Sequence, residues 1–279
     1  MKIKFWGARG SIPVSGAEFV KFGGDTACVE ITSAAGHKLI IDAGTGIRNL
    51  GKRMIADKTD SCSLIFTHAH WDHIMGFPFF RPIYRKNFRL ELYGCPIAKH
   101  AVKDMISRTM QPPNFPVKFE DIAAHIGTEK ACGESFFLDG VHVSPVPLSH
   151  PGGGTGYKLV ENGRSFVFLT DNELGHVHPG GLKFDEYAAV CEGADLLVHD
   201  GDYLPEEYSR LKTWGHSSYT DALRLAMAAK VKRFAFFHHN QDRTDQAIDA
   251  IVAESRKMLE KAGMGTDCFA VAAGMETVL

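Results

Sequence analysis

A run of metal-binding side chains at residues 68–73 restricts this chain more than any other feature of its sequence. The apolar segment Leu64-Ile65-Phe66 is typical of a buried strand, and His68, His70, Asp72 and His73 follow it closely. Where a strand runs into a loop, the first two histidines can point to one side and close on one ion. The aspartate and the last histidine can then face a second ion nearby. Imidazole and carboxylate suit zinc, manganese or iron, so the run predicts a metal site at a strand end.

Further candidate ligands follow other predicted strands. The alternating segment 141–147 leads to His150 and then to three glycines, which makes this histidine a candidate third ligand of the first ion. The strand predicted at 165–169 leads to Asp171, whose two carboxylate oxygens can each coordinate one ion. The strand predicted at 233–237 is followed by both His238 and His239. Either histidine can complete the set.

The order of the elements predicts the fold class. Strands come in two blocks, each followed by helices, and every candidate ligand lies just past a strand end. This pattern is typical of an α/β (α+β) fold in which two sheets pack face to face, a four-layer αββα sandwich with the site along one edge. The segment 28–42 reads as a hairpin, 245–261 as a helix and 268–273 as the final strand. No linker or low-complexity segment interrupts residues 1–279, so a single domain is predicted.

Composition excludes several classes of protein. The 279 residues carry a formal charge of −2, which argues against a protein that coats nucleic acid electrostatically. No apolar run approaches the ~20 residues that a membrane span needs, and Gly7 interrupts the start too early for a signal peptide. The six cysteines form no C-x-x-C pair. Four of them adjoin apolar stretches and are predicted to be buried thiols, which favours a cytoplasmic protein: Cys28, Cys62, Cys191 and Cys268.

The H-x-H-x-D-H run and the later candidate ligands together resemble the signature of the metallo-β-lactamase superfamily, whose members are mostly metal-dependent hydrolases. The resemblance implies two divalent metal ions. One ion is expected at His68, His70 and His150 and the other at Asp72, His73 and His238, with Asp171 bridging them. His238 is preferred over His239 because the family histidine follows its strand immediately. Asp42 matches an aspartate that braces the histidine loop in the family, and we expect it to support that loop without binding metal.

Other motifs resemble one branch of the superfamily. The opening segment 5–13, the pair His199-Asp200 and the triplet Gly215-His216-Ser217 are similar to ribonuclease Z-type enzymes and their phosphodiesterase relatives. The resemblance implies that His216 donates a proton or binds phosphate, and that Asp200 orients its imidazole. The nucleophile is expected to be a hydroxide that bridges the two ions, with Asp72 orienting it.

The sequence also bears on the substrate. Ribonuclease Z proper commonly carries a long arm for transfer RNA between the positions that match His150 and Asp171, where this chain offers only an Asn162-Gly163 hairpin. We therefore expect a small or cyclic phosphodiester, such as a cyclic nucleotide, rather than nucleic acid, and no membrane partner. A homodimer is expected by analogy with the family. The alternatives are RNA processing of the ribonuclease Z kind, thioester or lactone hydrolysis, and a non-enzymatic metal-binding sensor.

The proline-rich segment 111–117 admits two interpretations. Phe115 and its neighbours either form a rim over the metals, where the ring binds substrate by stacking, or belong to a packed connector. The sequence does not decide between them.

Overall fold

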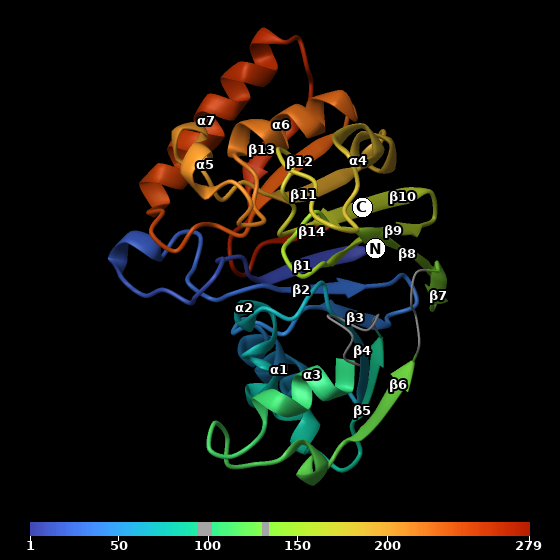
Figure 1. The fold of residues 1–279 in the computed structure, drawn as a ribbon. Helices are drawn as coiled ribbons and strands as arrows, with labels where there is room; N and C mark the ends of the chain where they lie inside the picture. The colour runs from blue at the N-terminus through green and yellow to red at the C-terminus, as the bar shows by residue number, and fades with distance from the viewer. Residues whose placement is uncertain (94–101, 130–133) are drawn as a thin grey trace.

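Two seven-stranded sheets stack face to face in the computed structural model, which describes residues 1–93, 102–129 and 134–279 (Figure 1). Across the first sheet the strands are, in order, β14 (Glu276–Val278), β1 (Lys2–Gly7), β2 (Cys28–Thr32), β3 (Lys38–Ile41), β4 (Ser61–Ile65), β5 (Arg89–Tyr93) and β6 (His125–Glu129). Across the second sheet they are β13 (Asp267–Ala270), β12 (Arg233–Phe237), β11 (Leu196–Asp200), β10 (Arg164–Leu169), β9 (Thr155–Glu161), β8 (Val141–Pro147) and β7 (Phe136–Leu138).

Helices cover the outer face of each sheet (Figure 1). The α-helices are α1 (Ile47–Ala56), α2 (Trp71–Ile74), α3 (Val102–Thr109), α4 (Phe184–Cys191), α5 (Pro205–Leu211), α6 (Tyr219–Ala228) and α7 (Asp245–Lys261). Short 3-10 turns are η1 (Ala17–Phe19), η2 (Phe77–Phe79), η3 (Arg81–Tyr84) and η4 (Phe119–Asp121). Apolar side chains of α1 and α3 pack on the first sheet, and those of α4, α6 and α7 pack on the second. The predicted αββα sandwich is confirmed.

The alternation of side chains along the strands produces these layers. In β10, Phe166 and Phe168 point between the sheets, whereas Val167 and Leu169 point toward the helices of the second sheet. Successive side chains of a strand face opposite sides, so a strand that is apolar at every position is covered on both faces. The core between the sheets draws residues from both of them. We propose on this basis that residues 1–279 form one domain.

Strand direction explains where the candidate ligands meet. The strands β10, β11, β12 and β13 pair in parallel, and β3, β4, β5 and β6 do the same in the other sheet. Strand β8 is antiparallel to β9, which is antiparallel to β10, so β8 and β10 run in the same direction. The carboxyl ends of parallel strands lie at one edge of a sheet, and the loops that leave them build sites there.

Most elements predicted from the sequence are present. The 28–42 hairpin is confirmed by the antiparallel pairing of β2 with β3, and the predicted helix 245–261 matches α7. Ser218 caps α6 by accepting the amide of Asp221, as their spacing predicts. The spacing of Val102, Met105 and Ile106 in the sequence predicts a helix over 97–110; α3 spans Val102–Thr109, and residues 97–101 lie outside the described ranges.

The prediction that 268–273 forms the last strand was wrong. Strand β13 ends at Ala270, and the chain continues into β14, which pairs with β1 at the edge of the first sheet. Its three residues, Glu276–Val278, are half-buried or exposed and form no apolar run, so periodicity does not reveal them. The N-terminus and C-terminus therefore meet, with the amide of Leu279 donating to the Met1 carbonyl at 3.0 Å.

The four cysteines predicted to be buried thiols are buried and free: Cys28, Cys62, Cys191 and Cys268. Burial raises the pKa of Cys191 to about 12, so this thiol is neutral at ordinary pH. Within the described ranges, no helix combines the length and apolar character that a membrane crossing requires.

Candidate dinuclear metal centre

Seven side chains that the sequence singles out converge at the carboxyl ends of four strands. The loop after β4 supplies four of them, and the loops after β8, β10 and β12 supply one each. We name His68, His70 and His150 the first group, and Asp72, His73, Asp171 and His238 the second group. Within each group, one nitrogen or oxygen atom of every residue lies within 4.8 Å of the others.

The first group presents three imidazole nitrogens to one point. Nδ1 of His150 donates to the carbonyl of Gly215 at 3.0 Å, so its Nε2 carries a lone pair, and this Nε2 lies 3.1 Å from Nδ1 of His70. Nδ1 of His68 donates to the Thr67 hydroxyl at 3.0 Å, because that hydroxyl gives its own proton to Asp42. The buried Nε2 of His68 has no hydrogen-bond partner in the described part of the chain. The hydrogen bonds at Nδ1 of His68 and His150 thus leave Nε2 of both residues available for a shared cation, and His70 lies beside them.

The second group mixes imidazoles with carboxylates. Nε2 of His238 lies 3.0 Å from Oδ2 of Asp72 and 3.1 Å from Oδ1 of Asp171. Nε2 of His73 lies 3.2 Å from Oδ2 of Asp72 and 3.3 Å from Oδ2 of Asp171. Oδ1 of Asp171 also lies 3.7 Å from Nε2 of His68, in the first group. The Asp171 carboxylate therefore faces both groups, as a bridging ligand must.

Asp42 contacts the histidine loop through three hydrogen bonds. Its Oδ1 accepts the Thr67 amide at 2.8 Å, and its Oδ2 accepts both the Thr67 hydroxyl and Nδ1 of His73 at 2.8 Å. A carboxylate on Nδ1 leaves the Nε2 lone pair of His73 free to bind a cation. These contacts agree with the supporting position expected for Asp42.

Burial and charge act differently on the two groups. Burial lowers the pKa of His68 well below its usual value and lowers that of His150 to about 4. Burial also opposes charge on His73 and His238, but the neighbouring carboxylates outweigh it. They raise the pKa of His73 well above its usual range and that of His238 to about 9. Positive charge is thus stabilised at the second group, which is the electrostatic property of a cation site.

Three side chains of the site project from residues in the left-handed backbone conformation: Asp42 (φ 64°), Asp171 (φ 58°) and His238 (φ 54°). This conformation is uncommon outside glycine and costs on the order of 1–3 kcal/mol per residue. Each of these residues stands just after a strand, where the sharp turn redirects the side chain into the cluster. Strain of this kind concentrates at functional sites.

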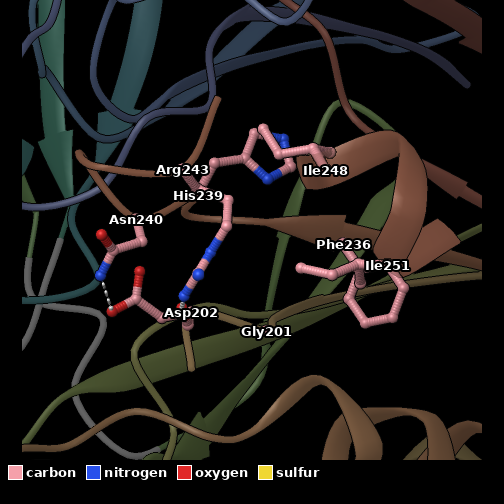
Figure 2. Close-up of a pocket in the computed structure, with 8 residues that line it drawn as sticks. All are labelled: Gly201, Asp202, Phe236, His239, Asn240, Arg243, Ile248 and Ile251. Atoms are coloured by element: carbon pink, nitrogen blue, oxygen red, sulfur yellow. Dashed lines mark hydrogen bonds between the residues drawn. The ribbon is translucent and has the colours of Figure 1, made fainter. Parts of the chain in front are cut away.

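The structure separates the two candidate histidines after β12. The ring of His238 enters the second group, whereas Nε2 of His239 donates to the carbonyl of Val271 at 2.8 Å. His239 also lines a small separate pocket with Asn240 and Arg243, shown in Figure 2. The geometry therefore favours His238 as the ligand.

The loop after β1 reaches the second group, a contact that sequence reasoning missed. The amide of Ser11 donates to Oδ2 of Asp72 at 2.9 Å. Gly10 packs so closely on His238 that an added Cβ would lie 2.2 Å from its Nδ1. The fully buried Arg9 ties this loop to the segment after His238 by donating to the carbonyls of Asn240 and Arg243. Arg9 and Gly10, in the opening segment 5–13, were the sequence signal from which this contact could have been found.

His216 lies beside both groups. Its ring centroid is 5.6 Å from that of His150 and 4.8 Å from that of His238, and its Nδ1 is 3.9 Å from Oδ1 of Asp171. Burial lowers the pKa of His216 to about 3, so the imidazole is neutral near pH 7.

The structure does not show the expected hydrogen bond between Asp200 and His216. Their closest atoms, Oδ2 and Nδ1, are 3.8 Å apart, which exceeds a hydrogen-bond distance. The Asp200 carboxylate instead accepts the backbone amides of Asn172 at 3.0 Å and Ser217 at 2.8 Å. Asp200 therefore joins the loop of Asp171 to the loop of His216 rather than orienting the imidazole directly.

Glu173 is a second residue that the sequence did not single out. Its buried carboxylate accepts the amides of Thr213 and Gly215, the hydroxyl of Tyr208 and Nε2 of His178, at 2.7 to 2.9 Å. These four contacts shape the loop before His216. His178 is accordingly a buried partner of Glu173.

Phe115 packs against neighbouring aromatic rings. It is partly buried beside the core under the first sheet, and its ring meets that of Phe79 edge-on at 5.6 Å. This contact favours the packed connector over the substrate rim for segment 111–117.

The donor atoms of both groups fit divalent metal ions. Imidazole nitrogens and carboxylate oxygens converge, and within the described ranges the buried Nε2 atoms of His68 and His73 have no hydrogen-bond partner. Donors of this kind accept zinc, manganese or iron, so the residues alone do not choose among the three metals.

Comparison with known proteins supports this description. The profile of the family described as "Beta-lactamase superfamily domain" matches residues 37–239. A ribonuclease Z of Sulfolobus acidocaldarius is 27% identical over 259 residues, covering 81% of this chain and 86% of that protein.

Solved structures show the same fold at low sequence identity. The metallo-beta-lactamase fold protein YhfI of Bacillus subtilis superposes with a TM-score of 0.71 at 16% identity, covering 99% of this chain and 98% of that one. Unliganded yeast PDE1 superposes with a TM-score of 0.69 at 14% identity, covering 100% and 99%.

Proposed function

The chain belongs to the beta-lactamase superfamily and is a metal-dependent hydrolase, and we propose that it cleaves phosphodiester bonds in RNA as a ribonuclease Z-like enzyme. The placement of His216 carries the proposal of phosphodiester cleavage. Its imidazole lies between a ligand of each group, His150 and His238, next to the carboxylate that faces both. A phosphate that contacts both ions would meet this ring.

Each group of ligands is proposed to hold one divalent ion. His68, His70 and His150 would hold one, Asp72, His73 and His238 would hold the other, and Asp171 faces both groups. Two such ions neutralise the phosphate anion and lower the pKa of an attacking water. Asp72 is proposed to orient that water, because its carboxylate lies at the centre of the second group and Ser11 holds it in place.

His216 is proposed to protonate the leaving oxygen. Because burial holds its pKa near 3 in the free chain, it needs a nearby anion to become charged. A bound phosphodiester supplies that anion. Asp200 contributes indirectly by fixing the loop that carries Ser217 and His216.

The comparisons favour RNA over the small substrate that the sequence suggested, because curated relatives that match along most of both chains are named ribonuclease Z. One structural observation favours a small or cyclic phosphodiester as the second candidate. Between His150 and Asp171 the chain forms only β9 and β10, joined by a two-residue turn at Asn162 and Gly163. No long arm for transfer RNA is present at that position.

The test compares substrates at equal enzyme concentration, with zinc or manganese bound. They are precursor transfer RNA with a 3′ extension, a panel of cyclic nucleotides, and bis(p-nitrophenyl) phosphate. Cleavage of the RNA at its 3′ extension supports the proposal, and turnover of cyclic nucleotides alone supports the second candidate. If both ions bind and no phosphodiester is cleaved, the proposal is wrong. Thioester and lactone substrates then separate other hydrolases from a non-enzymatic sensor.

Removing His216 tests its role. His216→Ala should lower kcat by about 10²- to 10⁴-fold, the usual contribution of a general acid, and leave two ions bound. The control is His125→Ala, since His125 is exposed on the edge strand β6 of the other sheet. Unchanged kcat in His216→Ala would exclude this histidine as the acid.

A further inference from the structure

Three buried polar atoms near the second group have no hydrogen-bond partner among the residues that the structure describes. They are Nδ1 of His216, Nδ1 of His238 and Oδ1 of Asp202. The three residues are 8%, 1% and 3% exposed, and one polar atom of each lies within 4.8 Å of the others. Burying such an atom without a partner costs stability, so each one calls for a physical explanation.

The separations fit a single bridging water. Oδ1 of Asp202 and Nδ1 of His238 are 3.9 Å apart, which is too far for a direct hydrogen bond. A water about 2.8 Å from both of these atoms subtends an angle of roughly 90°, within the range of a bent hydrogen-bonded water. One polar atom of His216 also lies within 4.8 Å of a polar atom of each of the other two residues. The water would accept both Nδ1–H groups and donate to Asp202.

The loop that carries Asp202 is held firmly. The Nδ2 of Asn240 donates to Oδ2 of Asp202 at 3.3 Å, the dashed contact in Figure 2. The neighbouring Tyr203 forms a backbone bridge with Ser218, two residues beyond His216. Asp202 is therefore tied to the segments of both histidines, and its free oxygen points toward them.

We propose that Asp202 is a positioning residue which, through one buried water shared with His216, holds the Nδ1 proton of His238. Held in this way, His238 keeps Nε2 turned toward Asp72 and Asp171, where it can bind the second ion. Asp42 does the same for His73 by direct contact at 2.8 Å. The second group then has a carboxylate behind each of its two imidazoles, an arrangement that orients the ligand and raises its basicity.

A water explains the cluster better than a third cation. A cation on Nδ1 of His238 would remove the proton that this tautomer needs while Nε2 serves the second group. The imidazole would have to lose both of its ring protons. Water requires no such loss.

The inference rests on the proposed function, since it takes His238 as a ligand, and the experiment separates the two. Ions bound per chain are counted by elemental analysis, and the affinity of each is measured by chelator competition, with the cobalt(II) absorption spectrum as a further readout. Asp202→Asn should lower the affinity of the second group for its ion by about 10- to 100-fold and leave the affinity of the first group unchanged. It should also alter the absorption spectrum of cobalt(II) bound at the second group.

The matched control is Asp195→Asn, since Asp195 is a buried aspartate just before β11, whereas Asp202 lies just after it. It should bind both ions as the unaltered protein does. If Asp202→Asn does not fold, Asn240→Ala replaces it in the test. This variant keeps the Asp202 carboxylate but removes its amide partner, and it should lower the affinity of the second group for its ion to a smaller extent.

Each outcome decides one question. An unaltered protein that binds fewer than two ions contradicts the proposed function. Two ions bound with unchanged affinity and spectrum in a folded Asp202→Asn variant would overturn the role of Asp202, and so would three ions per chain in the unaltered protein.

Discussion

The two groups of ligands share one edge of the fold and one carboxylate, yet they are supported in different ways. In the first group, His150 is oriented by a backbone carbonyl and His68 by a hydroxyl, and both have lowered pKa values. In the second group, His73 and His238 lie among carboxylates that raise their pKa values. The first group consists of neutral donors, whereas the second is charged and holds protons where a cation would bind.

The groups also differ in the chain segments that build them. The first uses the loops after β4 and β8, and His70 is exposed. The second is buried and uses the loops after β4, β10 and β12, while the loop after β1 packs against it through Gly10 and Ser11. More distant segments must meet to form the second group, so we expect it to be the more easily lost.

The largest effect is expected where the groups join. Asp171→Ala removes the carboxylate that faces both groups. The variant should lose at least one bound ion, and its activity should fall more than about 100-fold. That is a larger loss than the one expected for a residue that only supports a ligand. Elemental analysis and initial rates measure this. The exposed Asp267 on β13 provides the control Asp267→Ala. A fully active Asp171→Ala variant would show that the groups do not depend on a common ligand.

A smaller and selective effect is expected from the loop after β1. Gly10→Ala places a methyl group where the His238 ring stands, 2.2 Å from its Nδ1, and should displace that ligand. We expect loss of the second ion with the first retained, measured as metal content per folded chain. Gly265→Ala adds a methyl group in open space and serves as the control. Equal loss of both ions would erase the distinction between the groups.

The smallest effect is a difference in pH dependence. Below about pH 9 the free chain carries a proton on His238, which a cation at the second group must displace. Affinity there should therefore rise with pH, by up to about tenfold per unit for each proton released. The pKa of His150 is about 4 and that of His68 is also lowered, so affinity at the first group should stay nearly constant from about pH 6 to 8.

Chelator competition at several pH values measures both affinities. Calorimetry in buffers of different ionisation enthalpy counts the protons released. If the metal affinities of the two groups changed with pH in the same way, the difference in charge between the groups would be contradicted.

Local patterns in the sequence determined much of this protein. The apolar strands with ligands just past their ends predicted the αββα sandwich, and the H-x-H-x-D-H run together with His150, Asp171 and His238 named the residues that converge. A motif of this kind can be recognised in the sequence because its residues are close together and because parallel strands end at the same edge of a sheet.

Only the tertiary structure decided how the site is supported. The packing of Gly10 on His238, the hydrogen bonds of Asp200 to two loop amides, and the orientation of Asp202 join residues that are far apart in the sequence. The short edge strand β14 was missed because pairing with β1, and not its own composition, defines it. Periodicity reports which face of an element is buried, but contacts between loops depend on where the whole chain places them.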